Sequence, residues 1–235
     1  MKKAMNRESA SLIQPIQLLN VRVFLIPTQG GWALVDTGLP FFQDRLVHAI
    51  QARGVDLSGI QAIILTHGHL DHIGCLAALQ DLSGAAVICH SSLAPLLHQG
   101  LYEEAVPRVP LWKIFNQLVH QALGGSLQPV QADVVCEESL DLENYGLAGQ
   151  LLHTPGHSPG SLSIILETGE CFIGDLLREP APGRYDTGLF YDDLQEIFTS
   201  LRKIAAWHPS LVYLSHGSTM SGGELERFIR ENHPG

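Results

Sequence analysis

The alternation of apolar and polar positions divides the first half of the chain into short strands and amphipathic helices. Residues 20–26 and 32–35 are apolar runs separated by a Gly-Gly pair, which predicts a β-hairpin. Apolar residues at helical spacing over 42–53, followed by Gly54, predict a helix that ends at this glycine. Further elements are expected at 61–65 (strand), 73–79 (helix) and 85–89 (strand). Strand and helix therefore alternate in this half.

The second half of the chain is richer in strands. Its apolar runs are short, contain many β-branched residues and are separated by turn residues, as is typical of strands in a mixed sheet. Strands are expected at 134–135, 149–152, 161–166, 170–173 and 211–214, and helices at 192–206 and 223–230. Together the two halves predict an α/β chain in which mixed sheets are flanked by helices.

Residues 91–125 interrupt this pattern. The segment contains three prolines, followed by an amphipathic run over 111–119 that ends at a second Gly-Gly pair. About 35 residues cannot close a hydrophobic core alone. We therefore predict a helical insertion around 91–125 within one domain that spans residues 1–235.

Composition narrows the classes of partner. The net charge is −10 and only 14 residues are Lys or Arg, scattered along the chain. A nucleic-acid or anionic membrane surface needs clustered basic residues, so neither partner is expected. The chain also has 12 histidines, a high number for 235 residues. This is the first indication of metal chemistry.

The four cysteines and the N-terminus indicate a cellular compartment. The cysteines have no CxxC spacing and lie in apolar surroundings, so we expect buried free thiols of a reducing cytosol. Residues 1–11 contain no apolar run typical of a signal peptide, and no apolar run is long enough to span a membrane. A cytoplasmic location without a membrane segment is therefore expected.

Polar side chains follow four of the predicted strands at the points where these strands end. These residues are His67 and His69 after 61–65, His157 after 149–152, Asp175 after 170–173, and His216 after 211–214. In α/β proteins ligands bind in the crevice at the carboxyl ends of strands, where loops bring distant residues together. The sequence thus predicts one convergent site.

The motif THGHLDHIG at 66–74 indicates how such a site is built. In an extended loop residues i and i+2 point the same way, so His67 and His69 can bind one ion. Asp71 and His72 lie at the start of a helix and can face a second ion. Imidazole and carboxylate ligands suit Zn²⁺, with Fe or Mn as alternatives. Asp36, after strand 32–35, is either a buried turn carboxylate or the partner of a metal-bound histidine.

Four motifs in this order resemble the metallo-β-lactamase-fold hydrolase superfamily. They are THGHLDHIG (66–74), TPGHSPGS (154–161), IGD (173–175) and LSHGS (214–218), and LVDTG (34–38) extends the match. The resemblance implies a four-layer αββα sandwich of two mixed β-sheets flanked by helices. It also implies a dinuclear centre, with His67, His69 and His157 on one metal, Asp71, His72 and His216 on the other, and Asp175 bridging.

Departures from individual branches of the family narrow the expected activity. True β-lactamases usually have cysteine at the position of Asp175, and flavodiiron oxygen reductases have glutamate at that of His69. The acidic composition is unlike that of the nuclease branches. The chain most resembles the glyoxalase II and lactonase branch. It departs from glyoxalase II because we find no basic C-terminal helical region, and Tyr185 and Tyr191 are only candidates for the lactonase tyrosine.

We therefore expect a zinc-dependent hydrolase that cleaves a carboxylic thioester, ester or lactone of a small molecule. Two metal ions would share a hydroxide, and Asp71 would orient it or carry its proton. The alternatives are an oxidoreductase that resembles the mononuclear-iron persulfide dioxygenases, a phosphodiesterase on the same scaffold, and a metal-stabilised binding module. Candidate residues for the substrate pocket are Phe41, Tyr102, Trp112, Tyr185 and Tyr191. The aromatic residues of the insertion can equally pack against a second subunit, so a homodimer is a further expectation.

Overall fold

The first sheet of the protein carries most of the parallel strands. A computed structural model describes residues 12–106, 108 and 127–232. In spatial order the sheet contains β1 (Gln14–Leu18), β2 (Val21–Pro27), β3 (Trp32–Val35), β4 (Ile60–Ile64), β5 (Ala86–His90) and β6 (Val134–Cys136). The strands β1 to β3 pair antiparallel, whereas β3 to β6 pair parallel. The carboxyl ends of β3, β4 and β5 therefore lie at one edge.

The second sheet is mainly antiparallel. Its spatial order is β14 (Thr219–Ser221), β13 (Leu211–Tyr213), β10 (Glu170–Phe172), β9 (Leu162–Leu166), β8 (Gly149–His153) and β7 (Ser139–Asp141). Only β10 and β13 pair parallel in it. A separate hairpin of β11 (Arg178–Ala181) and β12 (Arg184–Asp186) follows β10. The strands β8, β10 and β13 run in the same direction, so their carboxyl ends share an edge.

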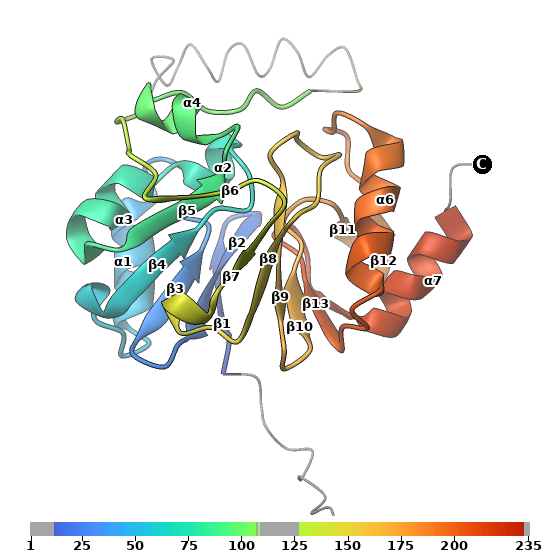
Figure 1. The fold of residues 1–235 in the computed structure, drawn as a ribbon, viewed down its shortest axis with the longest axis horizontal. Helices are drawn as coiled ribbons and strands as arrows, with labels where there is room; N and C mark the ends of the chain where they lie inside the picture. Colours follow the sequence, from blue (N-terminus) through green and yellow to red (C-terminus); the bar gives the residue numbers. More distant parts are fainter. Residues whose placement is uncertain (1–11, 107, 109–126, 233–235) are drawn as a thin grey trace, which may run out of the picture.

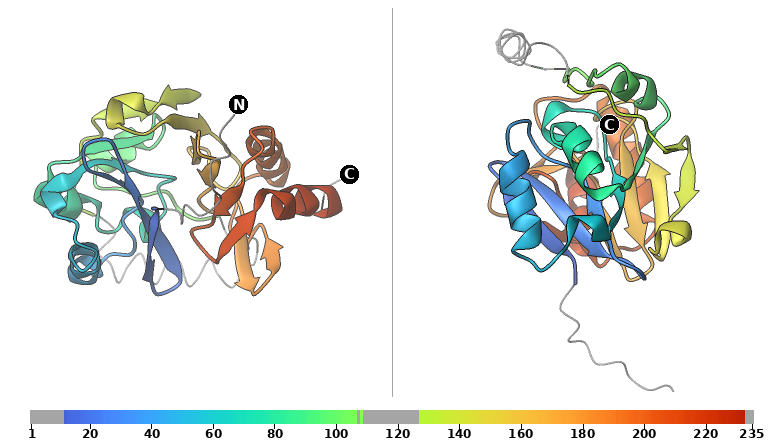
Figure 2. Two further views of the ribbon diagram at one scale, coloured as in Figure 1. Left: turned by 90° about the horizontal axis from the view of Figure 1, so that it is seen from below. Right: turned by 90° about the vertical axis from the view of Figure 1, so that its left-hand side faces the viewer.

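Helices cover the outer faces of both sheets (Figure 1; Figure 2). Among the described residues the helices are α1 (Gln43–Gln51), α2 (Leu70–Ile73), α3 (Leu76–Ser83), α4 (Ala94–His98), α6 (Leu194–Ala205) and α7 (Gly222–Asn232), with 3₁₀ turns η1 (Leu57–Gly59) and η2 (Glu143–Tyr145). Figure 1 shows α1 and α3 outside the first sheet and α6 and α7 outside the second, with the two sheets face to face. This confirms the expected αββα sandwich of mixed sheets.

Three apolar cores lie between the four layers. Along β2 the side chains alternate: Val23 and Leu25 belong to the core under α1 and α3, whereas Phe24 and Ile26 belong to the core between the sheets. The third core packs the second sheet against α6 and α7. A strand buried on both faces reads as a continuous apolar run. This is why β2 is recognisable in the sequence although it does not alternate with polar residues.

Most predicted elements are present, with one correction. The helix expected over 73–79 is two helices, α2 and α3, which meet at Gly74 and Cys75. The Gly74 amide donates to the Gly38 carbonyl at 2.8 Å and does not continue α2, and a Cβ at Gly74 would lie 2.2 Å from the Pro40 nitrogen. The short edge strands β1 and β14 were not expected. Of the insertion, α4 is helical, while residues 109–125, including Trp112, lie outside the described residues.

All four cysteines are buried and free, as expected. Burial raises the pKa of the Cys75 thiol to about 11 and that of the Cys89 thiol to about 12. These thiols are therefore protonated and unreactive at neutral pH.

Within the described part of the chain, no helix is both long and apolar enough to cross a membrane. The cytoplasmic location, the homodimer and the extent of the domain stay predictions.

Candidate metal centre

The loops after β4, β8, β10 and β13 converge at the shared edge of the two sheets. Three overlapping groups of residues bring their nitrogen and oxygen atoms within 4.8 Å of one another. The groups are His67 with His69 and His157, His67 with His72 and Asp175, and Asp71 with His72 and His216. The structure thus brings together all seven residues that the sequence singled out as ligands.

The first group consists of three buried imidazoles. His69 Nδ1 lies 3.1 Å from His67 Nε2 and 3.0 Å from His157 Nε2. Burial lowers the pKa of His69 to about 4 and that of His157 to about 3, and it holds the pKa of His67 well below its usual value. At neutral pH these rings are uncharged, and one nitrogen of each lies close enough to the others to offer its lone pair to a shared ion. A divalent cation at that point fits this donor set.

The group of Asp71, His72 and His216 lies beside the carboxylate of Asp175. His216 Nε2 lies 3.3 Å from Asp71 Oδ2 and 3.2 Å from Asp175 Oδ2. Burial opposes charge on His216, but the carboxylates of Asp175 and Asp71 outweigh it and raise the His216 pKa to about 10. The same attraction outweighs burial at Asp71 and lowers its pKa. Positive charge is therefore strongly favoured here, and a cation would supply it.

Asp175 lies between the two groups. Its Oδ1 is 3.4 Å from His72 Nε2, and its Oδ2 is 3.8 Å from His157 Nε2. Among the described residues, His72 Nε2 and Asp175 Oδ1 are buried without a hydrogen-bond partner. Such atoms destabilise a fold unless something else contacts them. A cation between these atoms would satisfy both, so the site fits divalent metal ions.

Asp36 unites the two roles that the sequence left open. This wholly buried carboxylate accepts hydrogen bonds from the Thr66 amide and hydroxyl, both at 2.8 Å. It also accepts a hydrogen bond from His72 Nδ1 at 2.8 Å. The carboxylate thus joins the end of β3 to Thr66, the first residue of the motif, and it directs His72 Nε2 toward Asp175. Carboxylates that orient metal-binding histidines in this way are common.

Gly156 allows the loop before His157 to pack closely against α6. Its φ is +126°, and a Cβ there would lie 2.3 Å from the Ile197 amide nitrogen of α6. We expect Gly156→Ala to lower the free energy of unfolding by about 2 kcal/mol or more, because strain and overpacking add. Denaturant unfolding of the metal-free protein measures this. Gly183→Ala is the control, since it has φ +73° but open space around the added methyl group. Equal losses in both variants would contradict the role of close packing.

Glu103 is a supporting residue that the sequence did not indicate. Its Oε2 accepts a hydrogen bond from the Gly68 amide at 2.8 Å, and its own amide donates to the Gly68 carbonyl at 2.8 Å. Gly68 separates His67 from His69, so this reciprocal pair holds the backbone between two candidate ligands. No motif surrounds Glu103, and its partners are backbone atoms that every residue has. The role of Glu103 could therefore not be inferred from the sequence.

We expect Glu103→Ala to weaken zinc binding about 10-fold, the lower end of the range for residues that support metal ligands. The reason is that the loop between His67 and His69 loses its carboxylate partner. Competition with a chromophoric chelator measures the affinity. Glu104→Ala, which removes the exposed carboxylate of the next residue, is the matched control. Wild-type affinity in Glu103→Ala would contradict the supporting role.

The aromatic candidates for a substrate pocket lie in different places. Phe41 is exposed and lines a cavity of about 350 Å³ with Ile73, Leu97 and Leu127, but no candidate ligand lines it. Tyr102 packs against the core under α1 and α3. Tyr185 and Tyr191 pack against the core under α6 and α7. The structure therefore does not gather these residues into one pocket.

Tyr191 is connected to the metal centre through its neighbour in the chain. The amide of Asp192 donates to the His157 carbonyl at 3.2 Å, and the Arg108 guanidinium lies 4.4 Å from the Tyr191 ring centroid.

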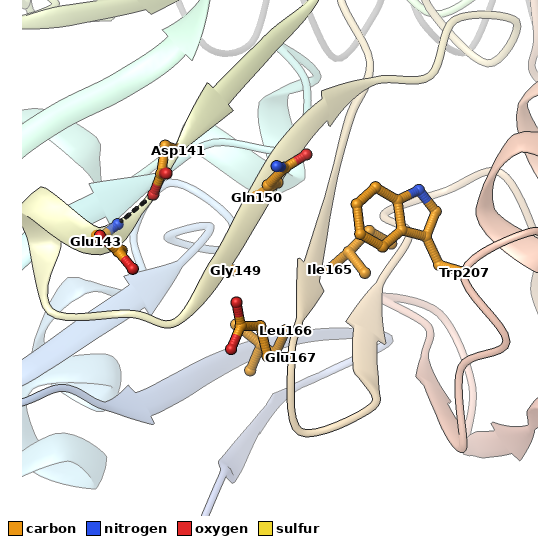
Figure 3. Close-up of a pocket in the computed structure, with 8 residues that line it drawn as sticks. All are labelled: Asp141, Glu143, Gly149, Gln150, Ile165, Leu166, Glu167 and Trp207. Carbon is orange, nitrogen blue, oxygen red and sulfur yellow. Dashed lines mark hydrogen bonds between the residues drawn. The ribbon is translucent and has the colours of Figure 1, made fainter.

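A smaller cavity of about 80 Å³, between η2 and Trp207, lies at the start of β8 (Figure 3). The candidate ligand His157 follows the other end of β8, so this smaller cavity is separate from the metal centre.

Comparison with known proteins agrees with the geometry. The sequence profile of the metallo-beta-lactamase superfamily matches residues 16–216. The probable metallo-hydrolase YflN of Bacillus subtilis is 24% identical, over 92% of this chain and 87% of its own. The hydroxyacylglutathione hydrolase GloC of Haemophilus influenzae is 26% identical, over 83% of this chain and 84% of its own.

Solved structures show the same fold. The archaeal superfamily protein ST1585 from Sulfolobus tokodaii has a TM-score of 0.66 and 22% identity, with 95% of this chain and 86% of that chain covered. TTHA1623, solved in a di-iron-bound form, has a TM-score of 0.65 and 29% identity, with 91% of this chain and 97% of that chain covered. The family profile spans every candidate ligand from His67 to His216. The chain belongs to the metallo-β-lactamase superfamily, whose members are metal-dependent hydrolases.

Proposed function

We propose that this protein is a dinuclear metallohydrolase that cleaves a carboxylic thioester, ester or lactone. The observation that carries the proposal is the position of Asp175, whose Oδ1 faces His72 and whose Oδ2 faces both His216 and His157. A single cation needs only one of the two groups. Two groups that share one carboxylate favour two ions held side by side.

Each residue has a distinct part in this proposal. His67, His69 and His157 would hold one ion, Asp71, His72 and His216 the other, and Asp175 would contact both. When bound, the ions would lower the pKa of a water molecule and polarise the substrate carbonyl. Asp71 is the most accessible candidate, with 27% of its side chain exposed. It is thus placed to orient the attacking water and to carry its proton to the leaving group.

The relatives and the ligand set support the proposed substrate class and metal. GloC is a hydroxyacylglutathione hydrolase, which acts on a thioester, and YflN is a probable metallo-hydrolase. We propose the same bond class for this chain. A ligand set of five imidazoles and two aspartates suits zinc. Iron is the alternative metal for this chain, because TTHA1623 was solved in a di-iron-bound form.

Elemental analysis of protein purified without added metal tests the centre. We expect two equivalents of zinc per chain in the wild type and fewer than two in His157→Ala. His98→Ala, which changes an exposed histidine on α4, is the control and should keep both. One iron per chain with oxygen consumption would overturn the proposal in favour of a persulfide dioxygenase-like activity. Binding of one zinc would also contradict it.

A substrate panel on the same preparation tests the bond class. We expect turnover of at least one thioester or lactone and little or none of a phosphodiester, because the net charge of −10 disfavours anionic substrates. Faster cleavage of the phosphodiester than of the thioester or lactone would contradict the proposed bond class. It would not contradict the proposed metal centre.

A further inference from the structure

Arg22 is a charged residue in a position where the rest of its strand is apolar. It shares a face of β2 with Phe24 and Ile26, which belong to the core between the two sheets. Only 9% of its surface is exposed, and its guanidinium lies 5.3 Å from the Phe24 ring centroid. Burial lowers its pKa, and the negative charge of Glu179 partly opposes this. Such a buried charge is costly unless its donors are satisfied.

The guanidinium donates across the interface between the sheets. Its Nε and Nη2 lie 3.2 and 2.8 Å from the Leu214 carbonyl oxygen. The Arg22 amide donates to the Ser215 carbonyl at 2.8 Å. Because β13 ends at Tyr213, these two carbonyls lie beyond the strand. Arg22 therefore supplies donors to a segment that leads directly to His216.

A third contact continues the same connection. His216 Nδ1 donates to the Asn20 carbonyl at 2.8 Å, which leaves Nε2 to face Asp71 and Asp175. Residues 20–22 are thus joined to residues 214–216 by three successive contacts. On its other side the His216 carbonyl accepts from the Glu179 amide at 2.8 Å. From the first sheet, Asn20 in the turn before β2 and Arg22 in β2 contact residues 214–216. These contacts set the distance between β2 and His216.

We propose that Arg22 is a positioning residue that holds His216 at the second metal position from the opposite sheet. The inference rests on the proposed dinuclear centre. A side chain of the same length without donors would fill the space but leave the Leu214 carbonyl without its two N–H partners. The segment would then drift relative to β2, and His216 Nδ1 would lose its alignment with Asn20.

The test compares Arg22→Met and Arg22→Lys with Arg53→Met. Arg53 is a matched control because its guanidinium also joins two elements through carbonyls, at 2.8 Å from Ala49 and 2.9 Å from Pro15, away from the metal centre. Isotherms for Zn²⁺ binding are calibrated with His216→Ala and His69→Ala, which identify the phase that belongs to each position.

We expect Arg22→Met to lower the Zn²⁺ affinity about 10- to 100-fold in the binding phase that is lost in His216→Ala. This is the range for other residues that support metal ligands. The phase that His69→Ala removes should change less than about twofold. Arg22→Lys should recover part of the affinity, and Arg53→Met should match the wild type. Equal weakening of both phases, or no weakening, would overturn the positioning role.

Amide hydrogen exchange of the metal-free proteins separates this inference from the proposed function. The amides of residue 22 and Ser215 should exchange about 10-fold faster in Arg22→Met, because the first donates to the Ser215 carbonyl and the second, which donates to the Gly174 carbonyl, lies in the segment that Arg22 holds. Exchange in Arg53→Met should be unchanged there. If the wild type bound only one ion, the dinuclear proposal would fail, and exchange alone would decide whether Arg22 holds the segment. Unchanged exchange in Arg22→Met would overturn the inference.

Discussion

Asp175→Asn is expected to remove the second equivalent of metal and to lower kcat/KM by about 10³-fold or more. The amide has nearly the same size as the carboxylate, so the core around it is kept. However, the amide lacks the negative charge of the carboxylate. The carboxylate oxygens lie 3.4 Å from His72 Nε2 and 3.2 Å from His216 Nε2. Half of the amide presents N–H groups, which cannot ligate a cation. Both metal positions lose their shared ligand.

Elemental analysis and steady-state kinetics on one preparation measure the two effects of Asp175→Asn together. Asp186→Asn is the matched control, because Asp186 is a half-exposed carboxylate on β12 that pairs with Arg178 at 2.7 Å. It should keep full metal content and activity. Two equivalents of metal in Asp175→Asn would show that this residue is not the shared ligand.

Asp71→Asn is expected to lower kcat by about 10²- to 10⁴-fold, the range of general acid–base catalysis. The folded structure should be nearly unchanged, because Asp71 is partly exposed and lies on the short helix α2. The carboxylate loses its charge where a proton must be accepted, and the amide cannot replace it. Its pairing with His216, at 3.3 Å, also weakens. A smaller part of the loss will therefore come from metal affinity.

Activity measured at saturating zinc separates these two contributions for Asp71→Asn, and thermal unfolding checks the fold. Asp81→Asn, an exposed carboxylate on the neighbouring helix α3, is the control. Turnover equal to the wild type at full metal occupancy would remove Asp71 from the mechanism.

The strand ends explain why so much of the site is readable without coordinates. A buried strand such as β4 appears as an apolar run, and the residues after it must lie at the edge of the sheet. Parallel strands place these edges together, so His67, His157 and His216 could be assigned to one site before their distances were known. The single helix expected over 73–79 was wrong, because the Gly74 amide bonds to the Gly38 carbonyl and the chain forms two helices, α2 and α3.

The aromatic candidates show a limit of the same approach. Phe41, Tyr102 and Tyr191 contact different parts of the protein, although each was expected near the substrate. Large apolar side chains are suitable both for a core and for a pocket, and residue type alone does not distinguish these roles. Metal ligands are more readily recognised because several costly groups must converge.

By itself the sequence determined the layered α/β class, the set of strand-end histidines and aspartates, and the family to which the chain belongs. Only the tertiary structure decided how those residues are held. The support of Gly68 by Glu103 and of the Leu214 carbonyl by Arg22 joins positions far apart in the chain. Each of these contacts uses a backbone atom as one partner. Every residue has such atoms, so the sequence contains no pattern that predicts these contacts before the fold brings the partners together.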